Sequence, residues 1–320
     1  MQVNSESAGS NSPLSAQSVS KHLTTVTHRL RKKKSMKIER ILVIGAGTMG
    51  RQIAMSCALS GYSTILQDIS EDALAAARKE LEAWATSRIA KGKLEAADAD
   101  AALNRLSQST DLVDSASSAD LVIEAAVEGL DIKEQIFATL GEHAPDHAIL
   151  ATNSSTLPSS RVAEASGRPE QVCNMHFFNP ALVMKCVEVV RNEQTSDETI
   201  KAVTEVATQL GKQPVIVNKE IPGFIANRMM GAINAEALNL AHAGIASIED
   251  IDTTAKTALG HPMGPFELMD MVGLDVIDFI AQATFAETGE ESDKPHPLIT
   301  QKVQAGHLGR KSGEGFYSYS

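Results

Sequence analysis

A glycine-rich turn between an apolar run and a helical pattern constrains this chain more than any other feature. The turn comprises residues 45–50, Gly-Ala-Gly-Thr-Met-Gly. The run before it, residues 41–44, is continuously apolar, as in strands that are buried on both faces of a parallel sheet. Apolar residues at helical spacing follow over 53–58. This order predicts an α/β fold in which a buried strand leads through a tight turn into a helix.

The same turn predicts a dinucleotide site. Its spacing fits G-x-G-x-x-G, where Gly45 permits the turn, Gly47 lets a pyrophosphate approach the backbone and Gly50 lets the helix pack closely on the strand. The helix N-terminus supplies free N–H groups for the phosphates. Asp68, eighteen residues beyond Gly50, would accept hydrogen bonds from the adenosine ribose and repel a 2′-phosphate, which favours NAD over NADP. FAD binding or a vestigial site are the alternatives, and the predicted cofactor-binding residues are Gly45, Gly47, Thr48, Met49, Gly50 and Asp68.

Strand and helix patterns alternate beyond this turn. Further strands are expected at residues 62–66, 120–124, 148–151, 171–175, 185–190 and 213–217. Helical patterns fall between them at residues 71–91, 94–106, 131–142 and 197–210. The alternation predicts a Rossmann-type doubly wound parallel sheet, followed by an all-helical C-terminal domain. The C-terminal helices are expected at residues 223–243, 247–258 and 265–284.

The chain divides into three predicted regions. Residues 1–37 are rich in Ser, Thr, Asn and Gln and lack the apolar core of a secretory signal, so we expect a disordered N-terminal extension. Residues 38–219 form the predicted NAD-binding Rossmann domain, and residues 220–320 form the helical domain, with the boundary at Ile221-Pro222-Gly223. The extension is either an organelle transit peptide or an addition upstream of a start at Met36.

Charge and cysteine content exclude several classes of protein. The formal net charge is −11, and because residues 1–37 hold seven Lys or Arg and one acid, the remainder is near −17, which argues against a nucleic-acid partner. The three cysteines are widely spaced within apolar segments, as expected for reduced thiols in a cytoplasmic protein, and they lack the spacing of a zinc site. No run of eighteen apolar residues predicts a transmembrane helix. We therefore expect no metal, no nucleic acid and no membrane partner.

A histidine and a carboxylate twelve residues apart form the candidate catalytic pair. His176 precedes the apolar run of residues 186–190, which contains Glu188. A carboxylate buried there without a partner would cost several kcal/mol, so an imidazole or a cation is expected opposite it. His176 is the obvious candidate. The alternative is that Glu188 faces solvent on an edge strand and His176 is an ordinary core histidine.

Six motifs in order give the chain a specific family resemblance. From Ile38 to Tyr319 it resembles the short-chain L-3-hydroxyacyl-CoA dehydrogenases, especially the bacterial 3-hydroxybutyryl-CoA dehydrogenases. The motifs are Gly45-Ala46-Gly47-Thr48-Met49-Gly50, Ile123-Glu124-Ala125-Ala126-Val127-Glu128, Thr152-Asn153-Ser154-Ser155-Thr156-Leu157, His176-Phe177-Phe178-Asn179-Pro180, Pro222-Gly223-Phe224-Ile225-Ala226-Asn227-Arg228 and Gly309-Arg310-Lys311-Ser312-Gly313-Glu314-Gly315-Phe316-Tyr317.

The resemblance implies a role for each matching residue. His176 would remove the C3 hydroxyl proton as hydride passes to nicotinamide, and Glu188 would orient this imidazole. Ser155 and Asn227 would lie near the C3 oxygen of the substrate. Other matching residues would contact the cofactor (Glu128, Lys133 and Asn153) or the CoA phosphates (Lys91). A solvated lysine is the alternative for Lys91, and the helical domain is expected to supply a homodimer interface.

The predicted activity is therefore reversible, NAD-dependent oxidation of a (3S)-3-hydroxyacyl-CoA, with a preference for short chains such as 3-hydroxybutyryl-CoA. One alternative is a related dehydrogenase that acts on a free hydroxy acid or a sugar acid. A second is a non-catalytic NAD-binding protein, which would have no physical reason to keep a costly buried acid-base pair.

Overall fold

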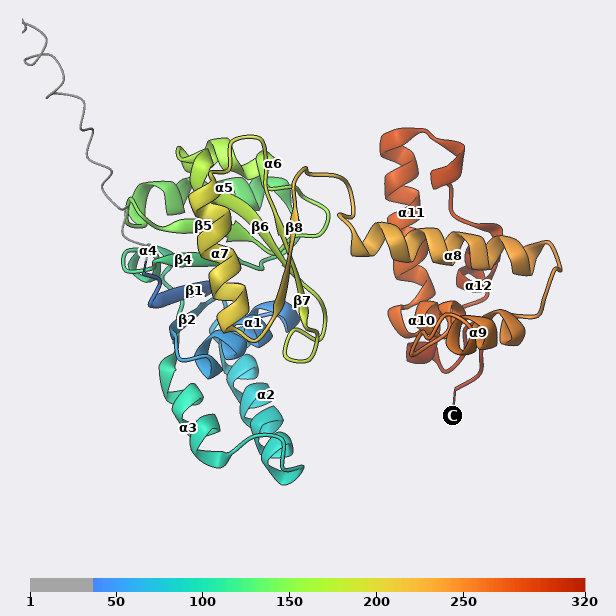
Figure 1. Ribbon diagram of the computed structural model, residues 1–320, viewed down its shortest axis with the longest axis horizontal. Helices are drawn as coiled ribbons and strands as arrows, with labels where there is room; N and C mark the ends of the chain where they lie inside the picture. The colour runs from blue at the N-terminus through green and yellow to red at the C-terminus, as the bar shows by residue number, and fades with distance from the viewer. Residues whose placement is uncertain (1–36, 320) are drawn as a thin grey trace, which may run out of the picture. The chain divides into compact units, whose positions relative to one another are not determined.

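The computed structural model describes residues 37–319 (Figure 1). Residues from Ile38 onward form one compact unit. The predicted disordered extension therefore lies almost wholly outside the described residues.

Eight strands form one sheet in the spatial order β3-β2-β1-β4-β5-β6-β7-β8. Neighbouring strands run parallel except at β6 and β7, which pair antiparallel, while β8 is parallel to β7. The predicted Rossmann-type sheet is confirmed, and its one reversal follows from the short connection between β6 and β7, because a parallel neighbour needs a crossover of about a dozen residues or more. The strands are β1 (Arg40–Ile44), β2 (Ser63–Gln67), β3 (Leu106–Ser109), β4 (Leu121–Glu124), β5 (Ile149–Thr152), β6 (Val172–Phe177), β7 (Cys186–Val190) and β8 (Gln213–Val217).

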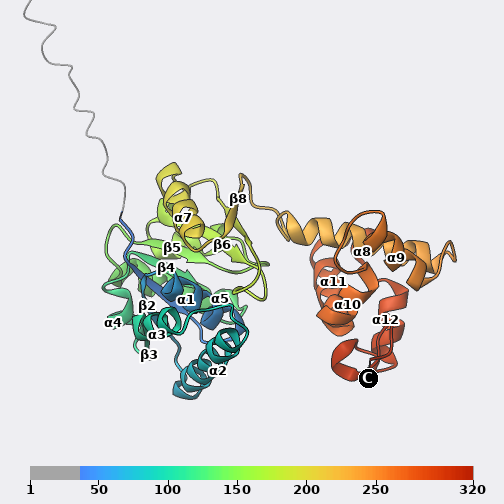
Figure 2. The same cartoon turned by 60° about the horizontal axis from the view of Figure 1, so that its bottom comes forward.

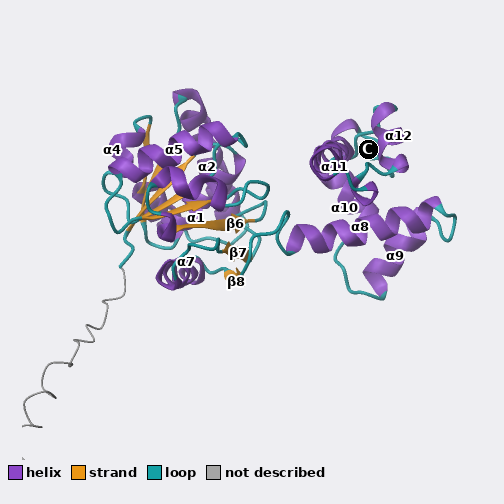
Figure 3. Ribbon diagram, turned by 90° about the horizontal axis from the view of Figure 1, so that it is seen from above, coloured by secondary structure: helices purple, strands orange, loops and turns teal. Residues whose placement is uncertain are grey.

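Helices cover both faces of this sheet, as Figure 3 shows. Alternate strand residues such as Leu42, Val122 and Leu150 form one core cluster with residues of α4, α5 and α6. The helix α7 packs against β6, β7 and β8, and α1 packs against β1 and β2. The helices of this half are α1 (Thr48–Leu59), α2 (Glu71–Ala90), α3 (Ala96–Arg105), α4 (Leu112–Ala116), α5 (Leu130–His143), α6 (Ser160–Ala163) and α7 (Asp197–Gln209).

Residues 220–319, the C-terminal part of the described chain, are helical as predicted, and two isolated β-bridges near the end were not predicted. Figure 2 shows α8 to α12 packed on one another. Their core contains buried residues that include Phe266 and Met269. Asp270 accepts hydrogen bonds from the backbone N–H groups of Phe316 and Tyr317, both at 2.9 Å, so one buried carboxylate fastens the C-terminal segment. These helices are α8 (Ala226–His242), α9 (Ile248–Thr257), α10 (Pro265–Val272), α11 (Leu274–Thr288) and α12 (Pro297–Gln304).

Several predicted boundaries were wrong. The segment 265–284 is two helices, because Gly273 adopts φ 105° and interrupts the pattern between them. The strand β3 and the helices α4, α6 and α12 were not predicted, and β3 has one buried residue in four, so it carries no strand-like apolar pattern. Tertiary pairing with β2 stabilises β3 in place of an intrinsic preference.

Two thiols are fully buried in the sheet half. Cys57 and Cys173 are free, and burial raises the pKa of each to about 12, as expected for unreactive core thiols. Within residues 37–319, none of the helices combines the length and the apolar character that crossing a bilayer requires.

The close approach of α5 to the chain at Ser166 gives a stability prediction. A Cβ atom at Gly141 would lie 2.1 Å from the Ser166 carbonyl oxygen, so Gly141→Ala must displace backbone. We expect the variant to lower the free energy of unfolding by about 1–3 kcal/mol in urea denaturation. The control is Glu142→Ala, on the exposed side of the same helix, with a change within about 0.5 kcal/mol. Equal effects of the two variants would contradict this reading of the contact.

Candidate active site

The hairpin of β6 and β7 brings the candidate catalytic pair together. His176 and Glu188 are partners in the antiparallel register, which places their side chains on the same face of the sheet. The imidazole Nδ1 lies 2.9 Å from the carboxylate Oε2, and the two residues are 6% and 1% exposed. The predicted contact is present, and the alternative of a solvent-facing Glu188 was wrong. Because Nδ1 faces a carboxylate, it carries a proton, which leaves Nε2 as the nitrogen free to exchange one.

Glu188 makes a second set of contacts with its other oxygen. Oε1 accepts hydrogen bonds from the backbone N–H groups of Ile225, at 3.0 Å, and Ala226, at 2.9 Å. These groups stand at the N-terminus of α8, where free N–H groups favour negative charge. One buried carboxylate therefore joins the His176 imidazole to the start of the helix that carries Asn227.

Aromatic rings surround the imidazole. The ring centroids of Phe178 and Phe224 lie 4.5 Å and 5.5 Å from that of His176. Phe224 adopts φ 46°, a left-handed conformation that is uncommon for a bulky residue, and it is packed with Val190 and Val217. This burial offsets the cost of the backbone conformation and shields the histidine from water on that side.

The remaining predicted catalytic residues lie on two flanking segments. Ser155 is half-buried in the loop between β5 and α6, and Asn227 is half-buried in the first turn of α8. Asn153, at the start of the same loop, accepts a hydrogen bond through Oδ1 from the Phe177 N–H at 2.9 Å, which ties the loop to β6. Among the hydrogen bonds of residues 37–319, none joins Ser155 or Asn227 directly to His176, so their roles stay predictions.

The glycine turn has the geometry that a dinucleotide requires. Gly45 adopts φ 97°, and a Cβ atom at Gly50 would lie 1.8 Å from the Gly45 carbonyl oxygen, so neither position tolerates a side chain. Asp68 lies against the turn, with Oδ2 accepting from the Ala46 N–H at 2.7 Å and Oδ1 accepting from the Ser70 N–H at 3.0 Å. No side chain caps the first turn of α1, which leaves its N–H groups available for phosphates. The residues present therefore fit NAD.

A buried ion pair supports the loop beside this turn. Lys133 is 1% exposed, and its Nζ lies 2.7 Å from Oε1 of Glu124 and 3.4 Å from Oε2 of Glu128. Glu124 also accepts hydrogen bonds from Thr152 Oγ1 and the Ala126 N–H, both at 2.7 Å. Glu124 was not among the predicted site residues. Its signal was a carboxylate that ends the apolar run of β4, which needs a buried cation nearby.

Lys91 and one cavity lie apart from these contacts. Lys91 is exposed at the carboxyl end of α2, and within the described part of the chain no hydrogen bond or ion pair joins it to the other predicted residues.

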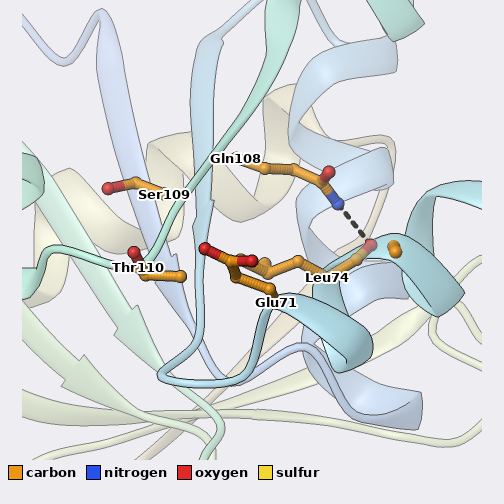
Figure 4. Close-up of a pocket in the computed structure, with 6 residues that line it drawn as sticks. Glu71, Leu74, Gln108, Ser109 and Thr110 are labelled. Carbon is orange, nitrogen blue, oxygen red and sulfur yellow. Dashed lines mark hydrogen bonds between the residues drawn. The ribbon is translucent and has the colours of Figure 1, made fainter.

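A cavity of about 460 Å³ lies between the start of α2 and the end of β3, lined by residues that include Glu71, Gln108 and Thr110 (Figure 4). It contains none of the predicted catalytic residues. No group of metal-ligating side chains occurs among residues 37–319.

Two family models match this chain over nearly all of its described length. The NAD-binding domain of 3-hydroxyacyl-CoA dehydrogenase matches residues 40–221, and the C-terminal domain of the same family matches residues 223–319. The chain belongs to the 3-hydroxyacyl-CoA dehydrogenase family.

Relatives and solved structures agree with this family. A probable 3-hydroxybutyryl-CoA dehydrogenase of Deinococcus radiodurans is 43% identical over 87% of this chain and 99% of its own length. The human mitochondrial hydroxyacyl-coenzyme A dehydrogenase is 40% identical over 89% of this chain and 93% of its own. The crystal structure of (S)-3-hydroxybutyryl-CoA dehydrogenase from Ralstonia eutropha has a TM-score of 0.83 at 38% identity, covering 89% of this chain and all of that one.

The double contact of Glu188 generates a stability prediction for this family member. Glu188→Ala leaves Nδ1 of His176 and two backbone N–H groups of α8 without their acceptor, so we expect the free energy of unfolding to fall by about 3–5 kcal/mol. Urea denaturation followed by circular dichroism measures the change. The matched control is Glu193→Ala at an exposed acid, for which the shift stays within about 0.5 kcal/mol. A Glu188 variant as stable as the control would contradict this account.

Proposed function

We propose that His176 and Glu188 carry out the reversible, NAD-dependent oxidation of a (3S)-3-hydroxyacyl-CoA to its 3-oxoacyl-CoA. The observation that carries the proposal is the buried contact of 2.9 Å between Nδ1 and Oε2, in a chain whose glycine turn fits NAD. Short substrates such as 3-hydroxybutyryl-CoA are the proposed preference, because several relatives carry the name 3-hydroxybutyryl-CoA dehydrogenase. The family membership also disfavours a free hydroxy acid or a sugar acid as the substrate.

The proton in this reaction moves through His176. Nε2 accepts the proton of the C3 hydroxyl group, and the electron pair of the broken O–H bond becomes the second carbon–oxygen bond of the ketone. The C3–H bond breaks at the same time, and its electron pair leaves with the hydrogen as hydride. NAD, when bound, supplies the acceptor for the hydride. Glu188 stabilises the imidazolium that results and holds the ring in one orientation. In the reductive direction the same imidazolium returns its proton to the carbonyl oxygen.

The polar residues beside the pair have separate proposed roles. Ser155 and Asn227 donate hydrogen bonds to the C3 oxygen, which polarises the ketone and stabilises negative charge as it develops. Glu128 and Asn153 lie on the cofactor side, where Lys133 holds the adjoining loop through its buried pair with Glu124. Lys91 is proposed to contact the CoA phosphates, because a lysine offers a strongly hydrated point charge to an anion.

The activity test compares substrates and histidines. The chain should oxidise NADH with acetoacetyl-CoA, and acetoacetate without CoA should support little turnover. His176→Ala should lower kcat by about 10²- to 10⁴-fold, because the general base is lost, while the Kd for NADH stays within about twofold. The control is His261→Ala, in the turn between α9 and α10, which should keep normal turnover.

Indifference to the CoA moiety would overturn the proposed substrate. Unchanged turnover of the His176 variant would overturn the proposed base. Initial rates across acyl-CoA lengths, with NADH and NADPH measured side by side, give the chain-length preference and the strictness for NAD.

A homodimer through the helical domain is part of the proposal. Apolar side chains that remain exposed lie on α8 and α11, where the spacing of four residues places members of each helix on one face. They include Met229 and Ile233 on α8, and Val276, Phe279 and Ile280 on α11. A second copy of the chain is the proposed cover, because self-association buries such a patch on both partners at once.

Sedimentation velocity tests the dimer. The chain should sediment at twice its own mass, and Phe279→Asp, at a side chain that is 72% exposed, should shift it toward the mass of one chain. Val113→Asp on α4, at an exposed apolar residue of the other half, should leave the mass unchanged. A wild-type chain that sediments as a monomer would exclude the proposed assembly.

We also propose a compartment and a pathway for this protein. Free, buried thiols fit a reducing compartment, the cytoplasm or an organelle matrix. Oxidation of 3-hydroxyacyl-CoA fits fatty-acid β-oxidation. Cell fractionation and growth on a fatty acid after deletion of the gene would test these two points.

A further inference from the structure

A network of buried polar side chains holds the loop that carries Ser155. At its start, Ser154 Oγ accepts hydrogen bonds from the N–H groups of Thr156, at 3.3 Å, and Leu157, at 2.8 Å, and donates to Oε2 of Glu128 at 3.0 Å. Deeper in the sheet, Asn174 donates through Nδ2 to the Ser154 carbonyl at 3.1 Å. Ser154 is 2% exposed and Asn174 is fully buried, so the loop has a rigid base.

The end of the loop is held at Ser159. Its N–H donates to Oδ1 of Asn174 at 2.8 Å, and its hydroxyl oxygen accepts from Nδ2 of Asn192 at 3.1 Å. The same hydroxyl donates at 2.7 Å to Oε1 of Glu220, which also accepts from the Ser160 N–H at 3.0 Å. Ser159 is fully buried, so its hydroxyl needs both partners.

Glu220 comes from a different part of the chain. It lies on the segment between β8 and α8, sixty-one residues from Ser159 in sequence. Asn227 follows seven residues later in the first turn of α8, and between them the N–H groups of Ile225 and Ala226 donate to Glu188. The segment is thus fixed at its start to the Ser155 loop and at its end to the catalytic carboxylate.

We propose that Glu220 is a positioning residue. It holds the loop that carries Ser155 at a fixed distance from the segment that leads to Asn227, so that the side chains of Ser155 and Asn227 both reach one substrate oxygen. This inference rests on the proposed roles of Ser155 and Asn227. Glu220 touches neither substrate nor cofactor in this scheme. Glu220 acts through geometry. A hydrogen-bond donor stabilises a developing oxyanion less when it is displaced by about 1 Å or less.

The first test separates the acceptor atom from the charge. Glu220→Ala should lower kcat/KM for acetoacetyl-CoA by about 10- to 100-fold, with a loss in kcat as well as a rise in KM. The Kd for NADH should stay within about twofold, because the cofactor turn lies on other elements. Glu220→Gln keeps an amide oxygen where Oε1 accepts both hydrogen bonds, so kcat/KM should recover to within about threefold of wild type. The control, Glu193→Ala at an exposed acid, should match wild type.

The second test asks whether Glu220 acts through Ser155. In a Ser155→Ala background, the loss caused by Glu220→Ala should shrink to about threefold or less, because the side chain that Glu220 positions is already absent. If the alanine variant does not fold, Glu220→Asp, which retracts the same charge by one methylene, replaces it in both tests. Purely structural damage would instead persist in the double variant and would weaken NADH binding to the same degree.

The outcomes distinguish this inference from the proposed function. Glu220→Ala with wild-type kcat/KM, alongside a Ser155→Ala variant that is impaired, overturns the role of Glu220 and leaves the proposed function intact. A glutamine variant as impaired as the alanine variant also overturns it. Normal turnover by both the Ser155→Ala and the His176→Ala variants would overturn the proposed function itself.

Discussion

The candidate active site depends on the hydrogen bonds that the Glu188 carboxylate makes. One oxygen faces Nδ1 of His176 and the other receives two N–H groups from the start of α8. Removing a carboxylate from water costs several kcal/mol unless its lone pairs are satisfied, and here three donors satisfy them. The same contacts fix the imidazole in one orientation and the first turn of α8 in one place. Catalytic geometry and the junction between the two halves of the chain therefore share a single residue.

Two further carboxylates, Glu124 and Glu220, each join more than one segment of this fold. At the end of β4, Glu124 accepts hydrogen bonds from Lys133, Thr152 and a backbone N–H group. Between β8 and α8, Glu220 accepts hydrogen bonds from the Ser159 hydroxyl and a backbone N–H group. An ionised carboxylate has about four acceptor sites, so it binds several donors without an internal donor of its own. Glu124 is the last residue of β4, and Glu220 lies in the segment that follows β8.

The features that could be predicted from sequence are those with short-range signals. The glycine turn follows β1, and Asp68 follows β2, so their spacing in the sequence predicts both. In the structure the Asp68 carboxylate accepts a hydrogen bond from the turn. The contact of His176 with Glu188 followed from the cost of a buried acid in an apolar run, which one short hairpin resolves. The Rossmann-type sheet followed from alternating patterns. In each case the partners lie within a few tens of residues or share one periodicity.

The features that were missed depend on partners far away in sequence. Three of the four residues of β3 are polar and one is buried, so pairing with β2 makes them a strand. Gly273 interrupts a helical pattern that is apolar on both sides, and its φ of 105° is a tertiary requirement. The sequence around Glu220 does not predict its role, because a glutamate before Ile-Pro-Gly is typical of a solvated linker residue. The structure shows that it accepts a hydrogen bond from Ser159.

Position in the chain explains why two carboxylates flank the junction. The proposed mechanism draws on a base from β6, a hydroxyl from the loop after β5 and an amide from α8, which come from residues 176, 155 and 227 of the chain. An oxygen atom of a carboxylate can accept two hydrogen bonds, and Oε1 of Glu188 and Oε1 of Glu220 each do so. Because Glu188 and Glu220 each accept more than one such bond, the segment between them is held at both ends without an additional structural element. Asn227 directly follows that segment, so its position depends on the hydrogen bonds of Glu188 and Glu220.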